Sequence, residues 1–189
     1  MIGALGFSGA MATNPFVLNR TQDTRFKVIA GYKSSAEIML AMQRGEVQGR
    51  GAYSWDFFKA DNPDWREKNE FNILVQIGLQ KEPELPDTPL LTELARDDVQ
   101  RAVFEFMSSD SVIARPFVVP PQVPAERLQI LREAFAQTMT DKEFLEEAAR
   151  QRSNVSPVSG PETYDAVAKI IGASEEVVKA AASLMAPPL

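Results

Sequence analysis

Residues 26–55 read FKVIAGYKSSAEIMLAMQRGEVQGRGAYSW, and this stretch decides the expected fold. Residues 26–30 form a short apolar run that ends at Gly31, which predicts a buried strand. A second strand is predicted through Val47 and Gln48, with a helix between the two. Strands that alternate with helices predict an α/β fold with a largely parallel sheet flanked by helices.

The helix between these strands has recognisable ends. Ser34 is the expected N-cap, and Glu37 three residues later completes a capping box. Ile38 and Ala41 recur at helical spacing, and Gly45 is expected to end the helix. The free N–H groups at the start of the helix then point into a crevice at the strand ends, which is a place to bind an anion.

Polar groups gather around this helix start. The loop supplies a phenol, an ammonium group, two hydroxyl groups and backbone N–H groups from Tyr32, Lys33, Ser34, Ser35 and Ala36. Arg50 lies between two glycines and is either a ligand clamp or a salt-bridge partner, with equal weight on each. Ser54 is the expected N-cap of a following short helix that carries aromatic residues.

A second turn is predicted near the N-terminus, between a strand over residues 2–5 and a helix over residues 10–19. The turn GFSGA is close to the nucleophile-elbow pattern, but Ala10 stands where glycine is required. The chain also contains no histidine to serve as a base for Ser8. The alternatives are an ordinary turn or an anion-binding turn formed by Gly6, Phe7, Ser8 and Gly9. Because both turns follow parallel strands, we expect them to meet at one edge of the sheet.

The composition is that of a globular protein and removes several classes of function. The 189 residues carry a net charge of −6, with 44% hydrophobic residues and no basic block, which disfavours nucleic-acid binding. The absence of cysteine and histidine removes thiol chemistry and the commonest metal ligands, and we expect neither a metal nor a cofactor. No apolar run approaches the length of a membrane span, and no signal peptide is recognisable. A core strand that begins at residue 2 suggests that the chain starts within a larger fold.

The remaining segments predict one more strand and several helices. Residues 71–79 alternate as a strand with both faces covered, and helices are expected from Asp87 and over residues 97–107. A short strand and a proline-rich crossing at 116–124 separate a ligand-binding lobe, residues 1–115, from a mostly helical part, residues 116–189. In that part we expect a short strand at 155–158, a frayed tail from Ala186, and the capping boxes Thr140–Glu143 and Ser159–Glu162.

The order of these segments resembles the periplasmic solute receptors of tripartite tricarboxylate transporters, the Bug family. The resemblance rests on IGALGFSG, on the stretch 26–55, on FNILVQIGLQKEPELPDTPLLTEL, on RPFVVPPQVPAERLQILREAF and on VSPVSGPETY. It implies a lobe of the type II periplasmic binding fold, a periplasmic location, a small carboxylate ligand and membrane subunits of a transporter as partners. It also implies that residues 116–189 are the returning part of the other lobe, whose first half has no counterpart here.

We therefore expect a solute-binding protein and not an enzyme. The carboxylate would be bound by the two turns, with Tyr32, Lys33 and Arg50 completing the contact. The isolated chain is expected to bind weakly, and the apolar faces of residues 116–189 to repack or to form a homodimer. The rival interpretations are a receptor fragment without binding of its own, an enzyme that uses Lys33, Tyr32 or Glu37 as acid or base, and a helical interaction module.

Overall fold

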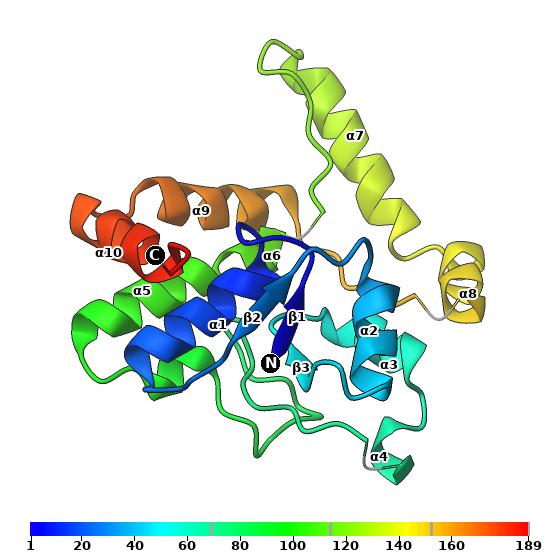
Figure 1. The fold of residues 1–189 in the computed structure, drawn as a ribbon. Helices are drawn as coiled ribbons and strands as arrows, with labels where there is room; N and C mark the ends of the chain where they lie inside the picture. Colours follow the sequence, from blue (N-terminus) through cyan, green and yellow to red (C-terminus); the bar gives the residue numbers. More distant parts are fainter. Residues whose placement is uncertain (69, 114, 152, 189) are drawn as a thin grey trace.

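The fold is built on a small parallel sheet (Figure 1). The computed structural model describes residues 1–68, 70–113, 115–151 and 153–188. Strands β1 (Ile2–Ala4), β2 (Val28–Ala30) and β3 (Gly49–Arg50) pair in the order β2-β1-β3, all parallel. Ile2 is in register with Val28 on one side and with Gly49 on the other. The predicted α/β class is confirmed, whereas a periplasmic-binding lobe remains a prediction.

The two crossover helices lie on opposite faces of this sheet. Helix α1 (Ala10–Thr21) joins β1 to β2, and α2 (Ser35–Gln43) joins β2 to β3. The first crossover runs from β1 to β2 and the second runs back across β1 to β3, and right-handed crossovers in opposite directions along a sheet put their helices on opposite faces. Helix α2 ends as the sequence predicts: Gly45 has φ +74°, and the N–H groups of Gly45 and Glu46 bond back to the carbonyls of Met42 and Ala41.

Aromatic residues fill the region after β3. Helices α3 (Trp55–Asp61) and α4 (Trp65–Lys68) follow the sheet. Phe58 is buried, and its ring contacts the rings of Tyr53, Trp55, Trp65 and Phe71 at centroid distances of 5.2–5.7 Å. These rings therefore form a packed cluster rather than a stacking platform for a ligand.

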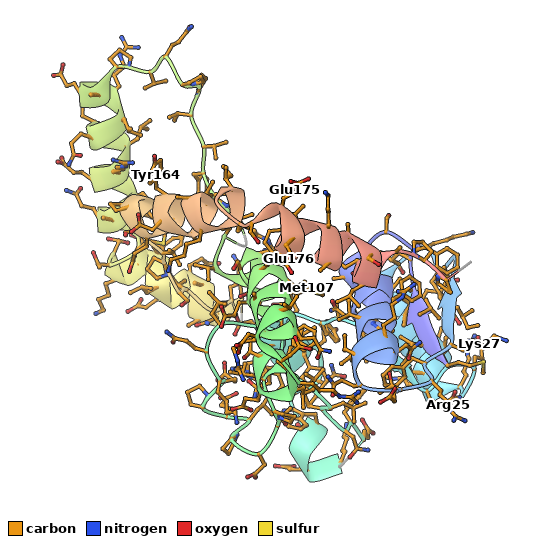
Figure 2. The ribbon with its side chains drawn as sticks, turned by 90° about the vertical axis from the view of Figure 1, so that its left-hand side faces the viewer. Arg25, Lys27, Met107, Tyr164, Glu175 and Glu176 are labelled. Carbon is orange, nitrogen blue, oxygen red and sulfur yellow. The ribbon has the colours of Figure 1, made fainter. Side chains whose placement is uncertain are left out.

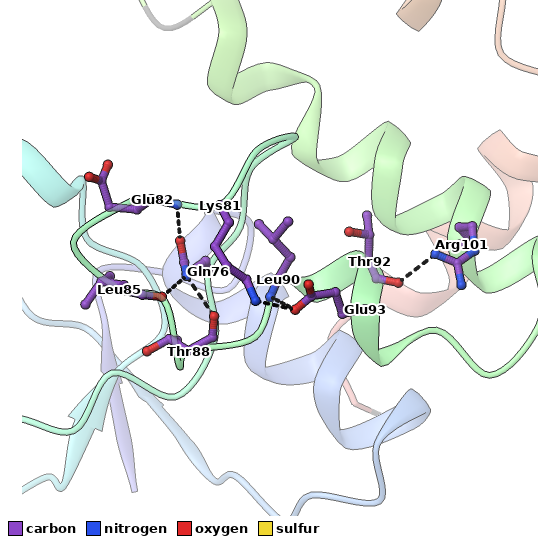
Figure 3. Close-up of polar contacts among 9 residues, drawn as sticks. All are labelled: Gln76, Lys81, Glu82, Leu85, Thr88, Leu90, Thr92, Glu93 and Arg101. Carbon is purple, nitrogen blue, oxygen red and sulfur yellow. Dashed lines mark hydrogen bonds and ion pairs between the residues drawn. The ribbon is translucent and has the colours of Figure 1, made fainter.

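The strand predicted over residues 71–79 does not form, and that prediction is wrong. The segment has one bridge, Gln76 to Leu90, and Leu74 on its second face is 63% exposed. The Gln76 side chain instead holds the following loop: Nε2 donates to the carbonyls of Leu85 and Thr88, and Oε1 accepts from Glu82 N–H (Figure 3). Backbone polar groups of the loop are thus bonded to the Gln76 amide, and they do not need partners from a longer pairing of strands. The helix expected from Asp87 is reduced to the 3₁₀ turn η1 (Leu91–Leu94).

The largest cluster of buried residues joins distant parts of the chain. Helix α10 (Glu175–Met185) packs on both α1 and α5 (Asp98–Ser108), whose N-cap is Asp97 (Figure 2). The buried members of this cluster are Val17, Leu91, Val103, Phe104 and Ala181. Arg20 of α1 also donates to the carbonyl of Leu184 at 2.7 Å. Helix α10 therefore belongs to the same core as the first hundred residues, although it comes last in the chain. The division of the chain at residue 115 stays a prediction.

Residues 115–151, called here the arm, extend away from this core (Figure 1). The arm contains α7 (Ala125–Thr138) and α8 (Lys142–Arg150), and α9 (Gly160–Ile171) follows it; the short α6 (Asp110–Ile113) precedes it. The strands predicted in 116–124 and 155–158 are absent from these described segments, because no sheet edge lies there to pair with them. The predicted capping box at Thr140 is wrong, since Asp141 is the N-cap of α8; the box Ser159–Glu162 is confirmed by both of its hydrogen bonds.

Candidate functional site

The loops after β1 and β2 meet at the carboxyl edge of the sheet. The N–H of Gly31 donates to the carbonyl of Leu5 at 3.3 Å, which places the two loops side by side. Both loops lead directly into helices, so two helix N-termini lie at this edge. Ligands of open parallel sheets bind at such edges. The expected meeting of the two turns is therefore found, and the contacts of each turn decide what it can bind.

The N-terminus of α1 has no side-chain cap. Gly9 is the N-cap in an extended conformation, and its carbonyl accepts from the N–H groups of Ala12 and Thr13. In the part of the chain that the structure describes, the N–H groups of Ala10 and Met11 have no protein acceptor. Uncapped N–H groups at a helix start attract negative charge, because the helix dipole is positive there.

A cavity of about 410 Å³ adjoins this helix start. Its first wall consists of Phe7, Ser8 and Thr13, and Phe7 is held by ring stacking on Phe16 at a centroid distance of 6.3 Å. Its second wall comes from the end of α10 and the tail, with Ala182, Met185, Ala186 and Pro187. The cavity combines the hydroxyl groups of Ser8 and Thr13 with apolar side chains. Ala186 and Pro187 are exposed and belong to the tail expected to fray, which stays a prediction, and Leu189 lies outside the described residues.

The N-terminus of α2 already holds a carboxylate of the protein. Ser34 Oγ accepts from the N–H of Glu37 at 3.1 Å, as the capping box predicts. The return bond differs from the prediction, because the Glu37 carboxylate accepts from the N–H of Lys33 at 2.7 Å and not from Ser34. No protein acceptor for the N–H groups of Ser35 and Ala36 is found among the described residues. An incoming anion at α2 would therefore meet the negative charge of Glu37.

Tyr32 and Lys33 are not among the residues that line the cavity. Tyr32 is half-buried, and its ring lies against Gly3 of the central strand, where an added Cβ would be 3.4 Å from Cε2. Lys33 is exposed. The structure thus brings Phe7 and Ser8 to the cavity, whereas the loop 32–36 lies beside it at the same edge.

Arg50 belongs to a separate cluster. Its Nε donates to the carbonyl of Ala52 at 2.9 Å, and its guanidinium lies 3.7 Å from the centroid of the Tyr53 ring. Burial lowers the pKa of Arg50, and its buried Nη1 has no hydrogen-bond partner among the described residues. The Tyr53 hydroxyl donates to the carboxylate of Asp61. Burial, together with this hydrogen bond, raises the pKa of Tyr53 to about 12. Among the described residues Arg50 forms no salt bridge and stacks on Tyr53; its role as a ligand clamp stays a prediction.

Ser54 follows this cluster in the chain, and residues of the helix that it precedes line a second cavity. Ser54 is exposed and precedes α3 as its N-cap, without a side-chain capping bond. A cavity of about 310 Å³ is lined by Asp56, Lys59, Ala60, Ser153 and Asn154. Lys59 is already paired with Glu84 at 3.0 Å, so this cavity offers less unpaired charge than the start of α1.

The site residues that sequence reasoning missed are Thr13 of α1 and those of α10 and the tail. Nothing near residues 182–187 has a binding motif, and their place in the cavity wall follows from the packing of α10 on α1. The described residues contain no group of three or more Asp and Glu side chains that could hold a metal ion. The carboxyl groups with shifted pKa values among them, Glu93, Glu147 and Glu162, are exposed and shifted downwards.

No family model, curated protein or solved structure matches this chain. Within the described ranges, none of the helices combines the length and the apolar character needed to cross a membrane.

Proposed function

We propose that this chain is the solute-binding component of a tripartite tricarboxylate-type transporter, and that it binds a small carboxylate at the start of α1. The proposal rests on two neighbouring features: a cavity of about 410 Å³ lined by Ser8 and Thr13, and the uncapped N–H groups of Ala10 and Met11, which lie between these two residues in the chain but are not among the residues that line the cavity. A hydrogen bond to a charged acceptor contributes about 1.5–3 kcal/mol, so two such bonds would hold one carboxylate group. The proposed location is the periplasm, with the membrane subunits of the transporter as partners, as the family resemblance implies.

The surroundings of the cavity favour a carboxylate with a partly apolar body. Phe7 and Met185 offer apolar contact, and the hydroxyl group of Ser8 offers one further hydrogen bond. The net charge of −6 repels anions at long range, so attraction must come from the local N–H groups. Phe7 is 49% exposed, which leaves one side of the cavity open to water. We therefore expect dissociation constants of roughly millimolar magnitude.

The enzyme alternative has less support. Its candidate acid or base groups were Lys33, Tyr32 and Glu37. Glu37 is exposed and bonded to the backbone of Lys33, and neither Lys33 nor Tyr32 lines the cavity. The raised pKa of Tyr53 makes its phenol a poor base near neutral pH.

A backbone substitution tests the proposal directly. Proline is favoured at the first position of a helix, so Ala10→Pro removes one proposed donor and leaves α1 intact. Gly9 is already extended, as a residue before proline must be. Ala125→Pro, at the first position of α7 in the arm, is the matched control.

The assay is an NMR titration of the ¹⁵N-labelled protein with dicarboxylates, tricarboxylates and amino acids. At least one acid should shift the amide signals of residues 7–11 in a saturable way. Ala10→Pro should weaken this binding about tenfold or more, whereas Ala125→Pro should leave it unchanged. Equal binding by both variants, or no saturable shift with any acid, would reject the site.

A further inference from the structure

The chain exposes far more surface than a compact monomer of its size. Its accessible surface is 12927 Å² for a mass of 20.9 kDa. The scaling observed for folded monomers gives roughly 9,000 Å² for this mass, so the excess is roughly 3,900 Å². Obligate homodimer interfaces bury about 2,000–5,000 Å² in total over both subunits. Each subunit of such a dimer buries half of this total, so the excess on one chain is larger than the surface that one subunit of a stable dimer buries.

The arm, residues 115–151, contributes to this excess. None of its residues is buried, and it extends from the body of the molecule (Figures 1 and 2). Phe117 and Val118 at its base are 89% and 83% exposed. The ring of Phe117 contacts that of Phe135 on α7 at a centroid distance of 5.7 Å, so the apolar surface of the base continues onto the helix.

An apolar stripe runs along α7, and α8 also exposes apolar side chains. On α7 it consists of residues at helical spacing: Leu128, Leu131, Phe135 and, at the helix end, Met139. Leu131 in its middle is 51% exposed, and Phe144 and Leu145 on α8 are also exposed. Exposed apolar patches of this extent on a folded chain mark interaction surfaces.

The charge of the arm favours a second copy of the chain as the occupant. The arm carries five Lys and Arg against six Asp and Glu, a net charge of −1, whereas the whole chain carries −6. Two arms can therefore approach with little repulsion. The acidic majority disfavours nucleic acid and anionic membranes, both of which require a basic surface. A two-fold interface needs a patch that is complementary to itself, and a continuous apolar stripe meets this requirement.

We propose that two copies of this chain form a dimer through their arms, with the α7 stripe of each copy packed against that of its partner. Dimerisation removes the stripe and the base of the arm from water and brings the exposed surface closer to that of a compact particle. This inference is independent of the proposed ligand site, because the cavity is lined by residues outside the arm.

The test is sedimentation velocity at protein concentrations up to about 100 µM. The wild-type protein should sediment with twice the mass of the 20.9 kDa chain. Leu131→Glu should weaken the dimer at least tenfold, and so should Phe117→Ser, whose parent side chain is too exposed to support the monomer fold. Leu74→Glu, at a residue outside the arm that is 63% exposed, is the matched control and should leave the dimer intact.

Cross-linking gives an independent readout. The chain has no cysteine, so Leu131→Cys introduces a unique thiol that should form a disulfide between two copies upon oxidation. A wild-type monomer at every concentration would overturn the proposal. So would a dimer that survives Leu131→Glu and Phe117→Ser with circular dichroism spectra unchanged.

Discussion

Replacing Gly51 by alanine should push α1 away from the sheet and lower the free energy of unfolding. Gly51 follows β3 and lies directly against α1. A Cβ added at this position would be 2.2 Å from the carbonyl oxygen of Met11 and 2.6 Å from Cδ of Pro15. The Asn14 side chain also donates to the carbonyl of Gly51 at 3.0 Å, and Asn14 is buried.

The magnitude follows from what can and cannot move. A backbone carbonyl and a proline ring inside a helix cannot rotate away, so the helix itself must shift. Overpacking of this kind costs about 1–3 kcal/mol, and losing the bond from Asn14 adds about 0.5–1.5 kcal/mol. We therefore expect a loss of about 1.5–4.5 kcal/mol, a large part of the 5–15 kcal/mol that stabilises ordinary domains.

Urea unfolding followed by far-UV circular dichroism measures this loss. The control is Gly6→Ala, because an added Cβ at Gly6 meets no atom within 4 Å. Its free energy of unfolding should stay within about 0.5 kcal/mol of wild type or rise slightly. In a chain of this length each kcal/mol corresponds to about 2–4 °C in the melting temperature. If Gly51→Ala is as stable as Gly6→Ala, α1 does not lie on Gly51 and the described packing of the site is incorrect.

Three further substitutions test other parts of the structure. Gln76→Ala removes three side-chain hydrogen bonds and should lower the free energy of unfolding in urea by about 1.5–4.5 kcal/mol. The control Gln129→Ala, at an exposed glutamine, should lower it by less. Asp97→Ala removes the N-cap of α5 and should lower stability by about 1 kcal/mol, whereas Asp97→Asn should largely preserve it. The folded-state pKa of Tyr53, about 12, exceeds the ordinary value of 10.0, so the folded chain retains a proton that the unfolded chain releases. Stability should therefore fall as pH rises from about 10 to about 12. Tyr53→Phe should remove this part of the slope, and an unchanged slope would show that Tyr53 ionises alike in both states.

The helix starts and stops were readable from the sequence because they depend on atoms a few residues apart. Ser34, Ser159 and Ser174 each accept a bond from a backbone N–H three residues later. Gly45 ends α2 because its positive φ favours glycine. The capping error at residue 140 arose because Asp141 competes for the same position and accepts the bond from Phe144 N–H.

The strand predictions failed where a strand needs a partner from elsewhere in the chain. Residues 71–79 have the alternation of a strand, but pairing depends on a free sheet edge, and β3 is only two residues long. Residues 117–119 are apolar enough for a strand, yet Phe117 and Val118 face water. Periodicity describes which side chains share a face, and it carries no information about what covers that face.

For the candidate site, the sequence determined the two β–α turns and their common edge. These features follow from local backbone preferences and from the parallel order of neighbouring strands. Only the tertiary structure decided that Arg50 stacks on Tyr53, that Glu37 occupies the start of α2, and that α10 lines the cavity beside Ser8. These contacts join residues through packing and burial, which depend on the whole chain and leave no pattern in any short stretch of it.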